Sequence, residues 1–368
     1  MHYYLDNKKA WVRENFSVGR TLKTPPSIQR LSRTVQATHK RARLLTRAIS
    51  SDMKGDVMEN PVCNPPESPT DHSGIQEMDI LLVGAGKMGL PIARNIQRRG
   101  HRLSVLDSSA ERRDLARAQG LEIAPTLESG LASAKVVITS LPHDAAFESM
   151  ASEIVACMKP EQIYVDTSTV SLAASQRVSR AFQEAQIPWL RVAVSGNPQM
   201  VEQKQSTTIA SGPLEVYQRV RPLLKLLGEA QFYVGPRDEA RIMKLAINLM
   251  VSGLSALLAE ALALGQKAGL DWATMCEVIA ASAAGAPVVR AKVAQIRHYD
   301  FAPTFTVGQM QKDVGLILDA GMDLRVPLPQ TGAVAQLLLQ TSALGFDSED
   351  YASVIKAVQQ SAGLPLHG

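Results

Sequence analysis

Apolar positions follow two different periods along this chain. Between residues 78 and 235, short apolar runs alternate with segments in which apolar residues recur every three or four positions. The runs predict buried strands and the periodic segments predict helices, an alternation typical of βαβ units and a parallel sheet. The predicted strands cover residues 80–83, 102–106, 136–140, 163–165, 190–194, 207–210 and 231–234.

After residue 235 the strand pattern stops. Residues 238–269 form one long helical pattern, and the sequence up to residue 364 is also helical in pattern, with breaks at residues 285–287 and 326–329. We therefore predict an α/β Rossmann-like N-terminal domain over residues 78–237. An all-α C-terminal domain for substrate binding and oligomerisation is expected over residues 238–368.

Part of the long helical pattern, residues 245–264, is apolar over about the length that crosses a bilayer. It also contains Asn248, Ser252, Ser255 and Glu260, and a charge in lipid is costly. We therefore expect a core helix shielded by its neighbours, and no association with a membrane.

Residues 1–77 do not have the pattern of a folded unit. Residues 30–47 are basic and residues 60–73 are rich in Pro and Ser, as linkers are. The start lacks a long apolar run, so we expect no secretory signal peptide. A transit peptide and a basic arm for an acidic partner are both possible interpretations, and we favour a poorly ordered extension. The expected location is cytoplasmic, or the mitochondrial matrix if this segment is a transit peptide.

Composition and charge exclude several classes of protein. The chain has 368 residues, of which 45% are hydrophobic, enough for the cores of two domains. Residues 1–77 hold 12 Lys and Arg against 8 Asp and Glu, which accounts for the whole net charge of +4. A neutral remainder argues against a nucleic-acid-binding surface. Cys63, Cys157 and Cys276 lie far apart, so we predict neither a disulfide scaffold nor a metal site.

A glycine motif follows the first predicted strand. Gly84, Gly86 and Gly89 have the spacing of the dinucleotide fingerprint, and a helical pattern begins directly after them. Its glycines permit a tight turn, the approach of a pyrophosphate and close packing of the helix on the sheet. We predict that the cofactor binds along the residues Gly84, Ala85, Gly86, Lys87, Met88 and Gly89.

Asp107, at the end of the second predicted strand, bears on which cofactor binds. A carboxylate there can accept both ribose hydroxyls of NAD and repels the 2′-phosphate of NADP. Arg112 and Arg113 follow closely and could soften that repulsion, but a solvated first helical turn is the interpretation we favour. NAD is therefore the expected cofactor, with NADP less favoured.

The long helical pattern carries a polar stripe. At about 100° per residue, Lys244, Asn248, Ser252 and Ser255 fall within one stripe roughly 80° wide on an otherwise apolar helix. A lysine that heads such a stripe directly after a nucleotide domain suggests a helix lining the cleft between domains. An ammonium group with a perturbed pKa could there exchange a proton with a substrate oxygen.

These residues resemble the β-hydroxyacid dehydrogenase family, which includes 3-hydroxyisobutyrate dehydrogenase and tartronate semialdehyde reductase. The resemblance covers roughly residues 79–358 and rests on separated motifs that occur in the family's order. The motifs are residues 83–89, Ser140-Leu141-Pro142, Asp166-Thr167-Ser168-Thr169, Val194-Ser195-Gly196, Lys244 with Asn248, Lys312-Asp313 and residues 326–329.

The resemblance implies roles on the substrate side of the site. Lys244 would be the general acid/base, and Asn248 would orient the substrate. Ser195, Gly196 and Asn197 would hold the substrate carboxylate, since an anion in a cleft needs hydrogen-bond donors.

On the cofactor side, the resemblance implies that Leu141, Pro142 and Thr169 line the nicotinamide ribose. Lys312, from the helical part, would close over the cofactor. The implied activity is an NAD-dependent dehydrogenase or reductase that acts on CH–OH groups and interconverts a small 3-hydroxy acid and its semialdehyde. The family also implies a homodimer or homotetramer, and the Ala- and Leu-rich helical segments favour one too.

The chain departs from the family pattern near the substrate. Residues 191–197 read Arg-Val-Ala-Val-Ser-Gly-Asn where the family has Asp-x-Pro-Val-Ser-Gly-Gly, and residues 199–202 replace small residues. Asp238 and Ala240 stand where glycines are common, and Ile247 replaces the first of two asparagines. These departures affect the expected shape of the substrate more than the expected reaction.

Two other functions are compatible with this fold. One is an imine or other short aldehyde-acid reductase, although imine reductases of this kind often lack the lysine that this chain has at Lys244. The other is a non-catalytic dinucleotide-binding scaffold that docks through the basic extension. The presence of Lys244, Asn248 and Ser195 favours the enzyme.

Overall fold

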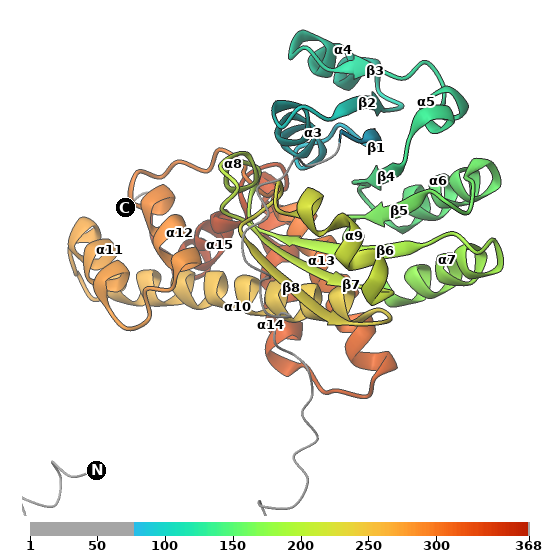
Figure 1. Cartoon of the computed structure of the whole chain (residues 1–368). Helices are drawn as coiled ribbons and strands as arrows, with labels where there is room; N and C mark the ends of the chain where they lie inside the picture. Colours follow the sequence, from blue (N-terminus) through green and yellow to red (C-terminus); the bar gives the residue numbers. More distant parts are fainter. Residues whose placement is uncertain (1–76, 367–368) are drawn as a thin grey trace, which may run out of the picture. The chain divides into compact units, whose positions relative to one another are not determined.

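The computed structural model describes residues 77–366, which contain one eight-stranded sheet and a set of helices (Figure 1). The predictions for residues 1–76 lie outside the described residues. The strands lie in the order β3-β2-β1-β4-β5-β6-β7-β8. Their bounds are β1 Asp79–Val83, β2 Arg102–Leu106, β3 Glu122–Ile123, β4 Val136–Thr139, β5 Ile163–Asp166, β6 Trp189–Ser195, β7 Thr207–Ser211 and β8 Ala230–Gly235.

Helices cover both faces of the sheet. Because successive side chains of a strand point to opposite faces, Ile80 and Leu82 of β1 share a core with α3 and α9, whereas Leu81 and Val83 share another with α5, α6 and α7. Burial on both sides explains why the strands are continuous apolar runs. The helices are α3 Gly89–Arg98, α4 Ala110–Ala118, α5 Leu127–Ser133, α6 Asp144–Cys157, α7 Leu172–Glu184, α8 Pro198–Glu202 and α9 Leu214–Leu224.

The sheet differs from the prediction in two places. β6 and β7 pair antiparallel, so the sheet is mixed and not wholly parallel. Only residues 196–206 connect these strands, and a parallel crossover needs roughly a dozen residues or more. The other difference is β3, which was not predicted because its two residues are too short to form an apolar run.

Beyond β8, the described residues up to 366 form helices joined by loops, which confirms the predicted fold class. The predicted breaks are real, since Pro287 begins α12 and Pro329 begins α14. A proline is tolerated at the first helical position because its missing N–H has no helical partner there. The elements are α10 Glu239–Lys267, α11 Trp272–Ala281, α12 Pro287–Arg297, α13 Val307–Asp323, α14 Pro329–Thr341, η1 Ser342–Phe346, η2 Tyr351–Ser353 and α15 Val354–Ser361.

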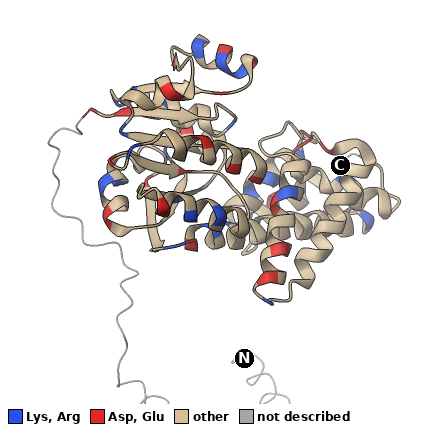
Figure 2. Ribbon diagram, turned by 90° about the vertical axis from the view of Figure 1, so that its right-hand side faces the viewer, with Lys and Arg blue, Asp and Glu red and all other residues tan. Residues whose placement is uncertain are grey.

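The long helix α10 connects the two parts of the fold. It packs on β6, β7 and β8 near its beginning and on α13, α14 and α15 further along (Figure 1). By length and apolar composition it also meets the requirements of a membrane-spanning helix. Figure 2 shows basic and acidic residues intermixed over the described ribbon, on the sheet part and on the helical part alike.

Candidate active site

The turn after β1 has no space beside its first and third motif glycines, whereas there is space beside the second. Gly84 has a φ of +100°, and a Cβ there would lie 2.3 Å from the carbonyl oxygen of Ser140. A Cβ on Gly89 would lie 1.8 Å from the carbonyl oxygen of Gly84. Beside Gly86, the nearest atom to a Cβ is Nη1 of Arg112, at 3.5 Å. A phosphate can therefore approach the backbone at Gly86, while the two outer glycines are fixed by packing.

The beginning of α3 has the free donors that an anion needs. Met88 is the N-cap residue, and no side chain caps the helix there. Lys87 is exposed beside it, and the first turn of α3 holds no acidic residue. Uncapped N–H groups and the helix dipole favour a bound phosphate, so this turn fits the pyrophosphate of a dinucleotide.

Asp107 binds the glycine turn itself. Its Oδ2 accepts a hydrogen bond from the backbone N–H of Ala85 at 2.7 Å, and its Oδ1 accepts one from Ser109 at 2.8 Å. The Arg112 guanidinium lies 3.9 Å from Oδ2, and Arg113 donates to the carbonyl oxygen of Asp107. Each carboxylate oxygen has a second lone pair, so binding a ribose hydroxyl is compatible with this structural role.

Loops after β4 and β5 lie together and meet the helical part. The backbone N–H of Leu141 donates to Ser168 Oγ at 2.8 Å, and Pro142 follows in an exposed position. Lys312 of α13 donates from Nζ to the carbonyl oxygen of Thr169 at 2.8 Å. The predicted cofactor residues Leu141, Thr169 and Lys312 are therefore linked by contacts, although they come from three segments.

Lys244 lies on α10 next to the loop that follows β6. Its side chain is partly buried, and Nζ donates to the carbonyl oxygen of Val194 at 2.8 Å. Burial lowers the pKa of this amine, the nearby charge of Lys312 lowers it further, and the carboxylate of Asp313 partly offsets both. An amine with a lowered pKa can gain and lose a proton closer to neutral pH than an ordinary lysine.

Ser195, Gly196 and Asn197 follow Val194 directly. Asn197 is the N-cap residue of α8, and its Oδ1 accepts a hydrogen bond from the N–H of Met200 at 2.8 Å. Its amide nitrogen is therefore the atom left for a ligand. α8 contains residues 199–202, the segment in which the sequence departs from small residues.

α8 is held from behind by α3. Asn95 donates from Nδ2 to the carbonyl oxygens of Val201 at 2.6 Å and Leu226 at 3.0 Å. Arg94 pairs with Glu202 at 2.9 Å. The residues that differ from the family pattern in this segment therefore form a short helix that α3 holds in place. This helix sets the shape of the loop beside Lys244.

The polar stripe of α10 divides into two parts. Asn248 is buried and donates to Oδ2 of Asp313 at 2.6 Å, and Lys312 pairs with the other oxygen of Asp313 at 3.0 Å. Ser252 and Ser255 are buried further along the helix, where Ser252 donates to a carbonyl oxygen of α10 itself. Among the described residues of this stripe, Lys244 and Asn248 are the ones that hydrogen-bond to groups outside α10.

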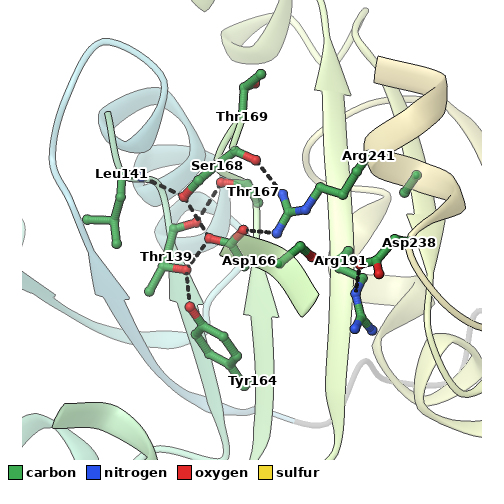
Figure 3. A network of polar contacts seen from close by, with 12 residues as sticks. Thr139, Leu141, Tyr164, Asp166, Thr167, Ser168, Thr169, Arg191, Asp238 and Arg241 are labelled. Atoms are coloured by element: carbon green, nitrogen blue, oxygen red, sulfur yellow. Dashed lines mark hydrogen bonds and ion pairs between the residues drawn. The ribbon is translucent and has the colours of Figure 1, made fainter. Parts of the chain in front are cut away.

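Two ion pairs at the beginning of α10 were not predicted (Figure 3). Arg191 and Asp238, two of the departures from the family pattern, pair with each other at 2.8 Å. Arg241 pairs with Asp166 in a fully buried contact. The partners lie 47 and 75 residues apart in sequence, so no local pattern could have joined them.

The described residues thus combine a dinucleotide turn, a buried amine and a loop of possible anion donors. Among residues 77–366 there is no group of three or more His, Cys, Asp or Glu side chains that could hold a metal ion. The chemistry that these groups can provide is proton transfer at an oxygen atom next to a bound dinucleotide.

Comparison with known proteins gives two family models on adjacent segments. Residues 79–235 match the NAD-binding domain of 6-phosphogluconate dehydrogenase. Residues 239–358 match the NAD-binding segment of NADP-dependent 3-hydroxyisobutyrate dehydrogenase. Together the two models span nearly all of the described residues.

Individual relatives and a solved structure agree with these models. A 3-hydroxyisobutyrate dehydrogenase from Pseudomonas aeruginosa is 30% identical over 294 residues, which are 76% of this chain and 97% of the relative. A 2-(hydroxymethyl)glutarate dehydrogenase from Eubacterium barkeri is 29% identical over 80% of this chain and 99% of the relative. The structure of a 3-hydroxyisobutyrate dehydrogenase from Mycobacterium tuberculosis with L-serine has a TM-score of 0.71 at 23% identity, covering 77% of this chain and 99% of that one.

Proposed function

The chain belongs to the β-hydroxyacid dehydrogenase family, and on this premise we propose that it interconverts a small 3-hydroxy acid and its semialdehyde. As an oxidoreductase of this family it acts on CH–OH groups and binds NAD(P). The observation that carries the proposal is the position of the partly buried Lys244 amine. Its Nζ lies 2.8 Å from the carbonyl oxygen of Val194, the residue directly before residues 195–197.

Lys244 is proposed to move the proton of the substrate oxygen. In oxidation the neutral amine takes the hydroxyl proton, and in reduction the ammonium group returns it to the carbonyl oxygen. With a nicotinamide held by the loops of Leu141 and Thr169, hydride transfer at the adjacent carbon is the chemistry that this cofactor would supply. The lowered pKa of Lys244 supports this role because it makes the neutral amine easier to form than in an ordinary lysine, and burial is its largest cause.

The acid group of the substrate is proposed to bind at residues 195–197. The Ser195 hydroxyl, the backbone N–H groups and the Asn197 amide are donors that suit a carboxylate. Asn248 is proposed to orient the substrate one helical turn from Lys244. Its bond to Asp313 supports this role because it holds the amide in one orientation.

We propose NAD as the preferred cofactor. The buried carboxylate of Asp107 at the end of β2 supports this preference, since it disfavours a 2′-phosphate. Arg112, half exposed beside both Gly86 and Asp107, is the group that would retain some NADPH activity. Replacing Asp107 with Asn should therefore reduce the difference in kcat/KM between NADH and NADPH.

A screen for NADH oxidation tests the proposed function. Short semialdehydes, with glyoxylate among them, are supplied to the full chain, and NADPH is run in parallel. Lys244→Ala should lower turnover by about 10²–10⁴-fold, the usual effect of a lost general acid/base, and leave NADH affinity unchanged. Near-normal turnover in this variant would show that Lys244 is not the acid/base.

We further propose a homodimer or homotetramer that buries the exposed side of α10. Apolar side chains recur there at intervals of seven residues, and each is considerably exposed: Met243 42%, Met250 64%, Leu257 60% and Leu264 75%. An apolar row at this spacing is what a second helix packs against. The self-complementary partner for such a row is α10 of another copy.

A further inference from the structure

Two arginine–aspartate pairs, one fully buried and one partly buried, hold the beginning of α10 against the sheet, and the side chains of only the first reach the cofactor loops (Figure 3). Arg241 and Asp166 form the first pair, and their side chains are 2% and 0% exposed. Arg191 and Asp238 form the second. A buried ion pair is by itself weak evidence for stability, so the contacts of each pair must decide what it does.

Arg241 joins α10 to the loop after β5 by two bonds. One terminal nitrogen binds Asp166 Oδ2, and the other donates to the carbonyl oxygen of Ser168. Thr169, the next residue, has its carbonyl oxygen bound by Lys312. Two consecutive carbonyl groups of this loop are therefore held by cations from two different helices.

Asp166 extends the same connection to the loop after β4. Its second oxygen, Oδ1, accepts from Thr139 Oγ1 at 2.5 Å and from Ser168 Oγ at 2.6 Å. Ser168 Oγ in turn accepts from the N–H of Leu141 at 2.8 Å. The guanidinium group of Arg241 is thus connected, through one carboxylate and one hydroxyl, to both loops that carry the predicted nicotinamide-ribose residues (Figure 3).

Arg241 precedes Lys244 by three residues, less than one turn of α10. A helix is stiff over one turn, so the position of Arg241 on the loops determines how far the Lys244 amine lies from them. While the bonds of Arg241 are made, the beginning of α10 with Lys244 cannot move away from the loops after β4 and β5.

The second pair has different neighbours. Asp238 also accepts from Ser175 Oγ at 2.6 Å, and Arg191 also donates to Ser179 Oγ at 2.7 Å. Arg191 lies over the Trp189 ring, 3.8 Å from its centre. None of these side-chain contacts reaches residues 139–142 or 166–169, although the backbone of Arg191 on β6 lies beside that of Asp166 on β5. The side chains of this pair therefore anchor α10 without binding the cofactor loops.

We propose that Arg241 is a positioning residue for the reaction: it fixes the Lys244 amine relative to the loops that hold the nicotinamide end of the cofactor. The inference rests on the proposed function of the site. Arg241 would act by holding other groups in place, since it is buried behind the loops and touches no reacting atom.

The test removes both charges of a pair together. Arg241→Met alone leaves the Asp166 carboxylate buried without its partner, which destabilises a protein whatever the role of the pair. The double variant Asp166→Asn with Arg241→Met leaves no unpaired charge. The Asn oxygen can still accept from Thr139 and Ser168, and Met packs near the Phe147 ring that Arg241 now faces. The matched control is Asp238→Asn with Arg191→Met, in which Met packs on Trp189.

The melting temperature, NADH affinity and steady-state turnover are measured for the parent and both double variants. Both variants should melt within a few degrees of the parent. The Asp166/Arg241 variant should lose about 10- to 100-fold in kcat, the cost of a displacement near 1 Å in a catalytic group, with KM for the substrate changed far less. Its primary isotope effect with deuterated NADH should rise, and NADH binding should weaken several-fold. The control should retain parental kcat and NADH affinity.

Parental kcat and parental NADH affinity in the Asp166/Arg241 variant would overturn the proposal. An equal loss of kcat in the control would overturn it too, because the effect would then come from anchoring α10 in general. If the parent shows no dehydrogenase turnover, the proposed function fails. NADH affinity then decides the inference separately: weaker binding in the test variant alone supports it, and equal binding in all three proteins overturns it.

Discussion

The glycines of the β1–α3 turn have different surroundings, so we expect one to matter for the stability of the fold and another for cofactor binding. Gly89→Ala should destabilise the fold by about 1–3 kcal/mol, the usual cost of overpacking, because its Cβ would lie 1.8 Å from a backbone oxygen. Gly86→Ala should leave the melting temperature unchanged and weaken NADH binding roughly tenfold or more, about 1.4 kcal/mol. Thermal melting and NADH fluorescence titration check both. A Gly86→Ala protein with parental NADH affinity would argue against a pyrophosphate at this turn.

The pH dependence of the reaction should respond to Asp313. Its carboxylate raises the pKa of Lys244, against burial and the charge of Lys312, which lower it. Asp313→Asn removes the raising effect and keeps an oxygen that can accept from Asn248, so the pKa of Lys244 should fall further. Oxidation needs the neutral amine, and the rising limb of its kcat–pH profile should therefore move to lower pH. Lys312→Gln should move the limb in the opposite direction, and a limb that stays in place in both variants would contradict the assignment of Lys244 as the base.

The places of several candidate residues could be predicted from local sequence, and some of their contacts could not. The glycine spacing and the stripe headed by Lys244 are local patterns, and the structure brings both next to the predicted loops. The structural use of Asp107 was missed because the sequence shows no link between this carboxylate and the N–H of Ala85. Arg191 and Asp238 were noticed as unusual residues, but their pairing is a property of the folded chain.

At the scale of elements, α8 and its N-cap residue Asn197 form a part of the site that departs from the family pattern. Asn197 caps this helix with Oδ1 and leaves its amide nitrogen for the substrate. Asn197→Asp should keep the cap, since Asp and Asn are equally good N-cap residues, so the melting temperature should change little. KM for the acid substrate should rise about tenfold or more, because a donor to a carboxylate is replaced by a like charge. An unchanged KM would place the substrate carboxylate elsewhere.

Element types were predictable wherever a run or period was long enough. The buried strand β1 and the 29-residue helix α10 follow directly from apolar runs and helical periodicity. The direction of β7 depended on the length of a connection whose helix, α8, has only five residues. Short elements carry too few positions for a period to emerge, and strand direction depends on loop length and packing more than on composition.

For the whole molecule, the exposed row on α10 leads to a prediction about assembly. Light scattering of the full chain should give a mass of two or four times 39.8 kDa. Leu257→Glu should shift the mass toward the monomer, because it places a charge in the middle of the proposed interface. Leu115→Glu, at a leucine of α4 that is 50% exposed, is the control and should leave the mass unchanged. A protein that is monomeric without any substitution would exclude an α10 interface.

The Arg191–Asp238 pair also has a consequence for how this sequence can diverge. A single replacement at either position leaves the other charge without its partner in a largely buried place, and this destabilises the fold. Lineages descending from this protein are therefore expected to change the two sites in concert, or to keep both. Correlated substitutions at positions 191 and 238 would identify related sequences in which this pair holds the beginning of the helix.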